Sequence, residues 1–204
     1  MDVMCNKPDY ENIKHLLNQE CEYKLSDTTL DRLLSLAEET SLANKKILIH
    51  AGETAPDIYI VKEGIIRFVD MDGDKERTFA FGLPGTMFMS RHSFVKGIPS
   101  YFQVEACTPA VVLRIKKKLY WELVENCHEF ALWVLHIAYE ELFFQEYKNR
   151  IINGSAKERY SGLLKSRPEI IKYVPQKIIA SYLGITPQYL SHLRRKPLPK
   201  ESGI

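Results

Sequence analysis

Apolar residues recur at helical spacing at both ends of the chain and at strand spacing between them. The segment from Tyr10 to Leu17, and a second one that begins with the cap signal Ser26-Asp27 and carries Leu30, Leu33, Leu34 and Ala37, predict two short helices. From about Leu42 the pattern changes to short β-rich runs separated by turn signals such as Asp72-Gly73. These runs are Ile47–Ile49, Ile58–Val61, Ile65–Val69, Thr78–Phe81, Phe102–Ala106 and Val111–Ile115. Short strands at such spacing predict a β-sandwich or jelly roll.

The helical period returns after Ile115. It predicts a short helix over Leu119–Val124 and a long one from Glu129 to about Ile151, without an internal Pro or Gly. The apolar residues of the long helix cover more than one stripe: Phe130, Leu132, Trp133, Leu135, Ile137, Tyr139, Leu142, Phe143 and Tyr147. We interpret this as one face on the β-domain and one on the same helix of a second subunit. The alternative is a helix buried wholly within its own chain.

Charge is distributed unevenly along the chain. The 204 residues are 45% hydrophobic and 26% charged, which excludes a disordered chain, and the net charge is +2. From Ser155 onward, however, the chain contains ten Lys and Arg but three Asp and Glu, which gives this part a net charge of +7. The first 154 residues therefore carry a net charge of −5. The basic part favours a polyanionic partner. With no apolar run of membrane-spanning length and no signal-peptide pattern at Met1–Lys7, we expect a cytoplasmic protein without a membrane partner.

The residue types that carry catalysis or hold metals form no recognisable group. None of the four cysteines lies in a Cys-x-x-Cys pair, and the six histidines include neither His-x-His nor His-Glu-x-x-His. No nucleophile elbow, Walker loop or dinucleotide fingerprint occurs. The sequence therefore predicts no catalytic residue, no metal site and no cofactor.

The segment Gln176–Arg195 fits a helix-turn-helix. With Gln176 as the first position, Ala180 is the fifth, where two helices approach closely, and Gly184 is the ninth, where the turn needs a positive φ. Thr186 is expected to cap the second helix, with Pro187 in its first turn. The predicted wedge between the helices consists of Ile179, Leu183, Ile185, Leu190 and Leu193.

Polar and basic side chains occupy the remaining positions of the second helix. The candidate DNA-binding residues are Thr186, Gln188, Tyr189, Ser191, His192, Arg194, Arg195 and Lys196. Gln188 is a candidate for an adenine, and His192 for a guanine or a phosphate. Arg194, Arg195 and Lys196 are expected at phosphates, which set affinity and salt dependence. An ordinary helical hairpin with a solvated basic face is the alternative.

The order of these elements, together with two stretches of the roll, resembles the Crp/Fnr family of bacterial transcription regulators. The stretches are Asp57–Gly64, followed by Asp72-Gly73, and Leu83–Phe88. The resemblance implies an α+β fold: a cyclic-nucleotide-binding-like β jelly roll in residues 1–127, a dimerisation helix in 128–153 and a helix-turn-helix domain in 154–204. It further implies a homodimer on double-stranded DNA with a two-fold site, the half-sites about 34 Å apart. RNA polymerase and an unidentified small-molecule effector are further candidate partners.

The sequence departs from that family in the effector pocket. Cyclic-AMP binders carry Gly-Glu where Met89 and Ser90 stand, and an Arg-Ser-Ala where Ser100-Tyr101-Phe102 precede Val104. A buried phosphate without its cation is costly, so we expect no cyclic-AMP binding. The candidate pocket residues are Gly85, Phe88, Met89, Ser90, Arg91, Tyr101 and Phe102, with Arg91 the nearby candidate cation.

Three further expectations concern the ends of the chain and other functions. The cysteine cluster of oxygen-sensing relatives is absent, and the basic segment Lys196–Ile204 predicts a reduced or absent wing. Pro187 stands where relatives carry a polar base reader, so the operator sequence cannot be taken from the family. Two other functions stay open. One is a cyclic-nucleotide module acting on protein partners, and the other is a cupin-like metalloenzyme, although this chain lacks the His-x-His that such metal sites usually have.

Overall fold

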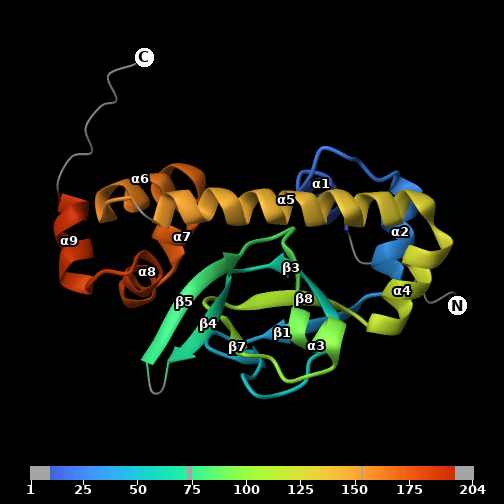
Figure 1. The fold of residues 1–204 in the computed structure, drawn as a ribbon, viewed down its shortest axis with the longest axis horizontal. Coiled ribbons are helices and arrows are strands. Elements are labelled where there is room, and N and C mark those ends of the chain that lie inside the picture. The colour runs from blue at the N-terminus through green and yellow to red at the C-terminus, as the bar shows by residue number, and fades with distance from the viewer. Residues whose placement is uncertain (1–9, 73–74, 153, 196–204) are drawn as a thin grey trace, which may run out of the picture.

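A computed structural model describes residues 10–72, 75–152 and 154–195 of the chain (Figure 1). Helices precede, interrupt and follow a set of short strands. The helices of this part are α1 Glu11–Leu17, α2 Asp27–Ser35, α3 Arg91–Lys96, α4 Lys117–Asn126, α5 His128–Ile152, α6 Ala156–Ser166, α7 Pro168–Tyr173, α8 Gln176–Leu183 and α9 Pro187–Arg195. The strands are β1 Glu38–Leu42, β2 Ile47–Ile49, β3 Ile58–Glu63, β4 Ile66–Asp72, β5 Lys75–Gly82, β6 Met87–Met89, β7 Phe102–Ala106 and β8 Ala110–Ile115.

The strands form two four-stranded antiparallel sheets that pack face to face. Sheet A has the order β1-β8-β3-β6 and sheet B the order β2-β7-β4-β5. Strands far apart in sequence are neighbours, as in a jelly roll, so the predicted α+β fold with an N-terminal roll is confirmed. In the predicted hairpin, Asp72 of β4 lies opposite Lys75 of β5, and the residues between them lie outside the described part.

Both faces of sheet A are buried, which explains why its strands are almost continuously apolar in sequence. In β3, Tyr59 and Val61 point into the roll, whereas Ile58 and Ile60 point outward to the helices. Alternate residues of a strand face opposite sides, so each apolar run serves two cores at once.

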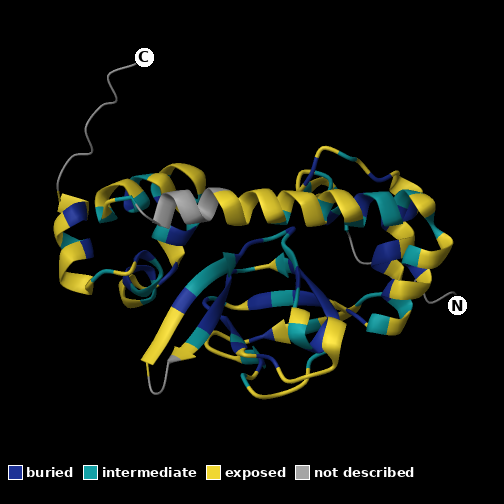
Figure 2. Cartoon of the chain, viewed as in Figure 1, coloured by how far each residue is buried: buried dark blue, intermediate teal, exposed yellow. Residues whose placement is uncertain are grey.

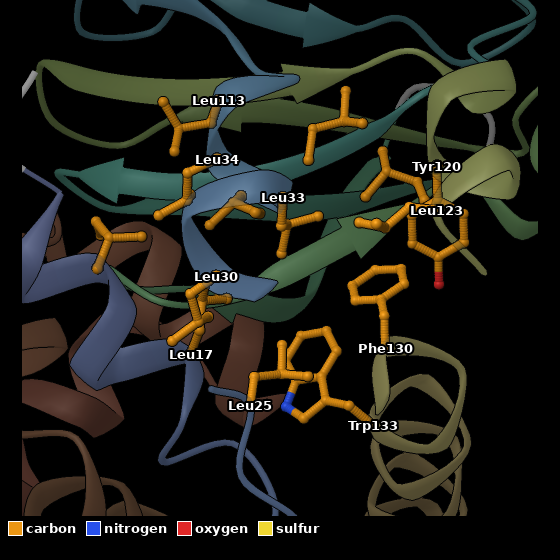
Figure 3. Packing of buried hydrophobic residues seen from close by; sticks show 14 of the residues in the cluster. Leu17, Leu25, Leu30, Leu33, Leu34, Leu113, Tyr120, Leu123, Phe130 and Trp133 are labelled. Carbon is orange, nitrogen blue, oxygen red and sulfur yellow. The ribbon is translucent and has the colours of Figure 1, made fainter. Parts of the chain in front are cut away.

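The outer core joins α1, α2, α4 and the start of α5 to sheet A. Phe130 and Trp133 of α5 are fully buried there, and their rings stack with centroids 5.7 Å apart (Figure 3). The carboxylate of Glu129 accepts hydrogen bonds from the Thr29 hydroxyl and from the Ser26 backbone N–H (2.6 Å). These hydrogen bonds attach the N-terminus of α2 to the start of α5.

Helix α5 runs along the roll from the N-terminal helices to the C-terminal ones (Figure 1). Beyond its buried first turns its described part is mostly exposed (Figure 2). Large apolar side chains are among the exposed residues: Leu135, Tyr139, Leu142, Phe143 and Phe144.

The structure corrects the predicted elements in several places. Strand β1 is absent from the prediction because it is a polar edge strand with one buried residue, Leu42, and pairs on one side only, with β8. Strand β6 and helix α3 are too short to show a period. Helix α2 ends at Ser35, so Ala37 lies beyond it, and α4 begins at Lys117 rather than Leu119.

Candidate nucleic-acid interface

Helices α8 and α9 meet at the turn that the sequence predicts. Gly184 has a φ of 64°, a left-handed conformation that favours glycine, and Ala180 is 1% exposed. Thr186 caps α9, its hydroxyl accepting a hydrogen bond from the Tyr189 backbone N–H at 3.1 Å. Arg159 of α6 donates from Nε and Nη2 to the Leu183 carbonyl, at 3.1 and 3.0 Å, and so satisfies the last turn of α8.

The buried side of α9 consists of Leu190 and Leu193, which face the other C-terminal helices. The opposite side is open to solvent and borders a shallow hollow of about 450 Å³. This hollow is lined by Pro187, Gln188, Ser191, His192 and Arg195. Four of the predicted DNA-binding residues therefore share one surface of α9.

The remaining predicted DNA-binding residues do not line that hollow. Tyr189 is 46% exposed, and its ring stacks on His192 with centroids 6.4 Å apart. Arg194 is exposed and does not border the hollow. Lys196 falls in residues 196–204, outside the described part, as does the expectation about the wing.

The positive charge of this region is poorly neutralised within the described residues. Between residues 154 and 195 the acidic side chains are Glu158 and Glu169. Glu158 accepts from the Ser155 backbone N–H at 2.7 Å, and this hydrogen bond lowers the pKa of Glu158. No described carboxylate pairs with Arg194 or Arg195, so both guanidinium groups are available to an anion.

Helix α8 is docked on the outer face of sheet B, a contact that the sequence did not predict (Figure 1). The Ser181 hydroxyl accepts from the Thr78 backbone N–H at 3.0 Å and donates to the Glu76 carbonyl at 3.3 Å. Because β5 is the edge strand of sheet B, Ser181 satisfies backbone groups that no strand pairs with. The rings of Phe81 and Tyr182 pack beside this hydrogen-bonded pair, with centroids 5.1 Å apart.

A buried ion pair lies on the same outer face of sheet B. Arg67 donates to Glu105 and to Glu76, both at 2.8 Å, and the side chains of Arg67 and Glu105 are 7% and 10% exposed. Burial lowers the pKa of Arg67, but hydrogen bonds to the two carboxylates outweigh burial and raise it overall. Burial raises the pKa of the nearby Cys107 thiol to about 12. A charged residue between buried apolar neighbours, as in Ile66-Arg67-Phe68 and Val104-Glu105-Ala106, was the sequence signal for this pair.

Aromatic side chains pack the interior of the roll where a nucleotide would be expected. The ring of Phe88 contacts Tyr59 and Phe68, with centroids 5.3 and 5.2 Å apart. Phe102 contacts Phe68 at 5.9 Å and Phe79 at 5.7 Å. Both Phe88 and Phe102 are buried, so these two predicted pocket residues belong to one packed aromatic cluster.

The other predicted pocket residues are not gathered around that cluster. Met89 points to the outer core because the next residue of a strand faces the opposite side from Phe88. Gly85, with a φ of 94°, faces α1, where a Cβ would lie 2.7 Å from Leu16. Arg91 pairs with Glu141 of α5 at 2.6 Å on the molecular surface, so it supplies no cation to the interior.

Ser90 and Tyr101 complete the predicted set. Ser90 is fully buried and its hydroxyl has no hydrogen-bond partner among the described residues. Tyr101 is 55% exposed, and its ring packs against Phe102 and His92. The seven residues thus divide between the inner core, the outer core and the surface.

The chain is similar to known proteins in the sequence of its roll and in its overall structure. Residues 39–127 match the family model of the cyclic nucleotide-binding domain, and no curated protein sequence matches the chain. FixK2 from Bradyrhizobium japonicum has a similar structure, with a TM-score of 0.65 and 22% identity over 78% of this chain and 83% of that one. The regulator CLP of Xanthomonas campestris has a TM-score of 0.65 and 14% identity, covering 83% and 90%. The catabolite activator protein of Thermus thermophilus has a TM-score of 0.55 and 17% identity, covering 84% and 83%.

The chain therefore has the fold of these proteins, and its residues 39–127 are similar to the cyclic nucleotide-binding domain. The predicted resemblance to Crp/Fnr regulators is confirmed at the level of fold. Every helix within the described residues is too short or too polar to span a membrane. The described residues also contain no cluster of three or more His, Cys, Asp or Glu side chains that could hold a metal ion.

Proposed function

We propose that this Crp/Fnr-type protein is a homodimeric, DNA-binding transcription regulator that acts in the bacterial cytoplasm and is not an enzyme. The observation that carries the proposal is the exposed face of α9. It presents polar side chains on a helix whose other side is fixed by Leu190 and Leu193, and the two arginines of this helix pair with no carboxylate among the described residues. Polar groups for base edges and cations for phosphates are what a recognition helix needs in the major groove.

The test is binding to DNA by the purified full-length protein. We expect it to enrich specific duplexes from fragmented genomic DNA, and we expect affinity to fall steeply with salt because phosphate contacts release counterions. Replacing His192, Arg194 and Arg195 together with Ala should abolish the enrichment. Replacing Lys157 and Lys172 with Ala is the control outside α9, since it removes two positive charges, as the α9 variant does when His192 is neutral.

A second outcome of the same experiment identifies the competing function. If the triple α9 variant binds duplexes as well as the wild type, the regulator proposal fails. The chain would then act as a cyclic-nucleotide-type module on protein partners, which the match of residues 39–127 also allows.

The partner that we propose for α5 is the same helix of a second copy. Five large apolar side chains of α5 are 47–66% exposed, and such a concentration on one helix marks an interface. A two-fold dimer would place two α9 helices on a two-fold DNA site. Sedimentation of the wild type should give twice the mass of the 23.6 kDa chain, and Leu142→Glu with Phe143→Glu should give the monomer.

We further propose that the roll does not bind cyclic AMP. A cyclic phosphate buried in the roll needs a cation, and each arginine of its strands and of α3 is already paired with a carboxylate. Phe68, Phe88 and Phe102 also fill the interior. Calorimetry should detect no heat of binding at micromolar cyclic AMP, and micromolar affinity would overturn this part of the proposal.

A further inference from the structure

We propose that Arg195 reads a base, guanine, in the major groove, while its neighbour Arg194 contacts a phosphate. From the sequence, both arginines were expected at phosphates. The inference rests on the proposed function and assigns to each arginine a different part of the DNA. It makes Arg195 a specificity-determining residue and Arg194 a residue for affinity.

The two arginines project from different sides of α9. Each residue of a helix is turned about 100° from the one before, so residues seven apart lie within about 20° of each other. Arg195 therefore lies on the same line as Gln188, a line that runs along the surface of α9 parallel to the helix axis. Both residues border the same hollow. Arg194 is turned about 120° from that line and does not border the hollow.

The line through Gln188 and Arg195 is the side of α9 that faces away from the protein. Leu190 and Leu193, which are buried, lie on average about 170° from Gln188 around the helix. A helix about 10 Å wide fits into a major groove about 12 Å wide, so its outermost line meets the base edges and its flanks meet the phosphate walls. Arg195 is on the outermost line, and Arg194 is on a flank.

Length and chemistry also favour a base contact by Arg195. Gln188 and Arg195 are about 10 Å apart along the helix axis, the length of about three base pairs. Helical side chains lean toward the N-terminus, so the guanidinium of Arg195 is directed back toward Ser191 and His192 on the same surface. The fork of an arginine matches the O6 and N7 acceptors of guanine, the commonest base-specific contact. Pro187 offers no donor at the start of the helix, so the C-terminal turn supplies the cationic reader.

The experiment measures base preference separately from affinity. Duplexes selected by the full-length wild type from a random pool are changed one base pair at a time, and binding is measured by fluorescence anisotropy. For the wild type we expect one guanine in each half-site whose replacement weakens binding about tenfold or more. Arg195→Ala should bind all four base pairs at that position equally, and Arg195→Lys should keep the salt dependence but lose most of the preference.

Arg194→Ala is the matched control, with the same charge removed one residue away. It should weaken binding to every duplex alike and reduce the slope of log affinity against log salt by about 1 for each lost phosphate contact. If Arg195→Ala keeps the full base preference and behaves as Arg194→Ala does, the assignment of Arg195 is wrong. A wild type that selects no duplex overturns the proposed function as well. Circular dichroism of each variant confirms that α9 is folded.

Discussion

The arginines of the jelly roll and those of α9 differ in what neutralises them. Each of the four in the roll forms an ion pair with a carboxylate: Arg67, Arg77, Arg91 and Arg114. Arg194 and Arg195 pair with no described carboxylate. A cation is free to bind a phosphate only where the protein has not already paired it. The difference supports our proposal that α9, and not the interior of the roll, binds an anionic partner.

The largest change in folding free energy is expected when the buried arginine of the roll, Arg67, is replaced. Arg67→Met leaves the carboxylate of Glu105 buried without its cation, and removing one partner of a buried pair costs about 3–5 kcal/mol of folding free energy. Chemical denaturation of the full-length chain measures the loss.

The control for that substitution is Arg77→Met. The side chain of Arg77 is 70% exposed and lies 3.6 Å from Asp70, so its replacement should change the free energy of unfolding by less than about 1 kcal/mol. Equal effects of the two substitutions on the free energy of unfolding would show that the ion pair of Arg67 with Glu105 does not stabilise the fold more than an exposed pair does.

A smaller effect is expected where α8 meets the roll. Ser181→Ala removes the acceptor of the Thr78 backbone N–H, and an unsatisfied buried donor costs about 1–3 kcal/mol. Hydrogen exchange at the Thr78 amide should accelerate. Ser166→Ala removes only an exposed hydrogen bond within α6 and should leave that amide unchanged. Unchanged exchange in Ser181→Ala would contradict the docking of α8 on β5.

The smallest effect is a pH dependence at the junction of α2 and α5. Hydrogen bonds from the Thr29 hydroxyl and the Ser26 backbone N–H lower the pKa of Glu129. A carboxyl whose pKa is lower in the folded state stabilises the fold above its unfolded pKa, and the stabilisation disappears as pH falls through the folded pKa. Glu129→Gln should therefore flatten the loss of thermal stability below about pH 5. Glu125→Gln, at an exposed position of α4, should retain the wild-type profile.

The sequence predicted local features better than long-range ones. The turn at Gly184, the small residue Ala180 and the cap at Thr186 follow from local backbone rules, and the structure contains all three. The predicted set of pocket residues combined side chains from the inner and outer faces of sheet A. Met89 lies in a three-residue strand, which is too short to show in the sequence which residues face which side. The contact of Ser181 with Thr78 joins residues 103 positions apart, and no local pattern encodes it.

The difference between the two groups of arginines is tested most directly by one titration. Binding of the full-length protein to a selected duplex is measured with and without millimolar cyclic AMP. We expect the same affinity in both conditions, since α9 already presents its cations and each described arginine of the roll is paired with a carboxylate. Binding that appears only after cyclic AMP is added would contradict the proposal that the paired arginines and packed aromatic rings of the roll leave no site for a cyclic phosphate.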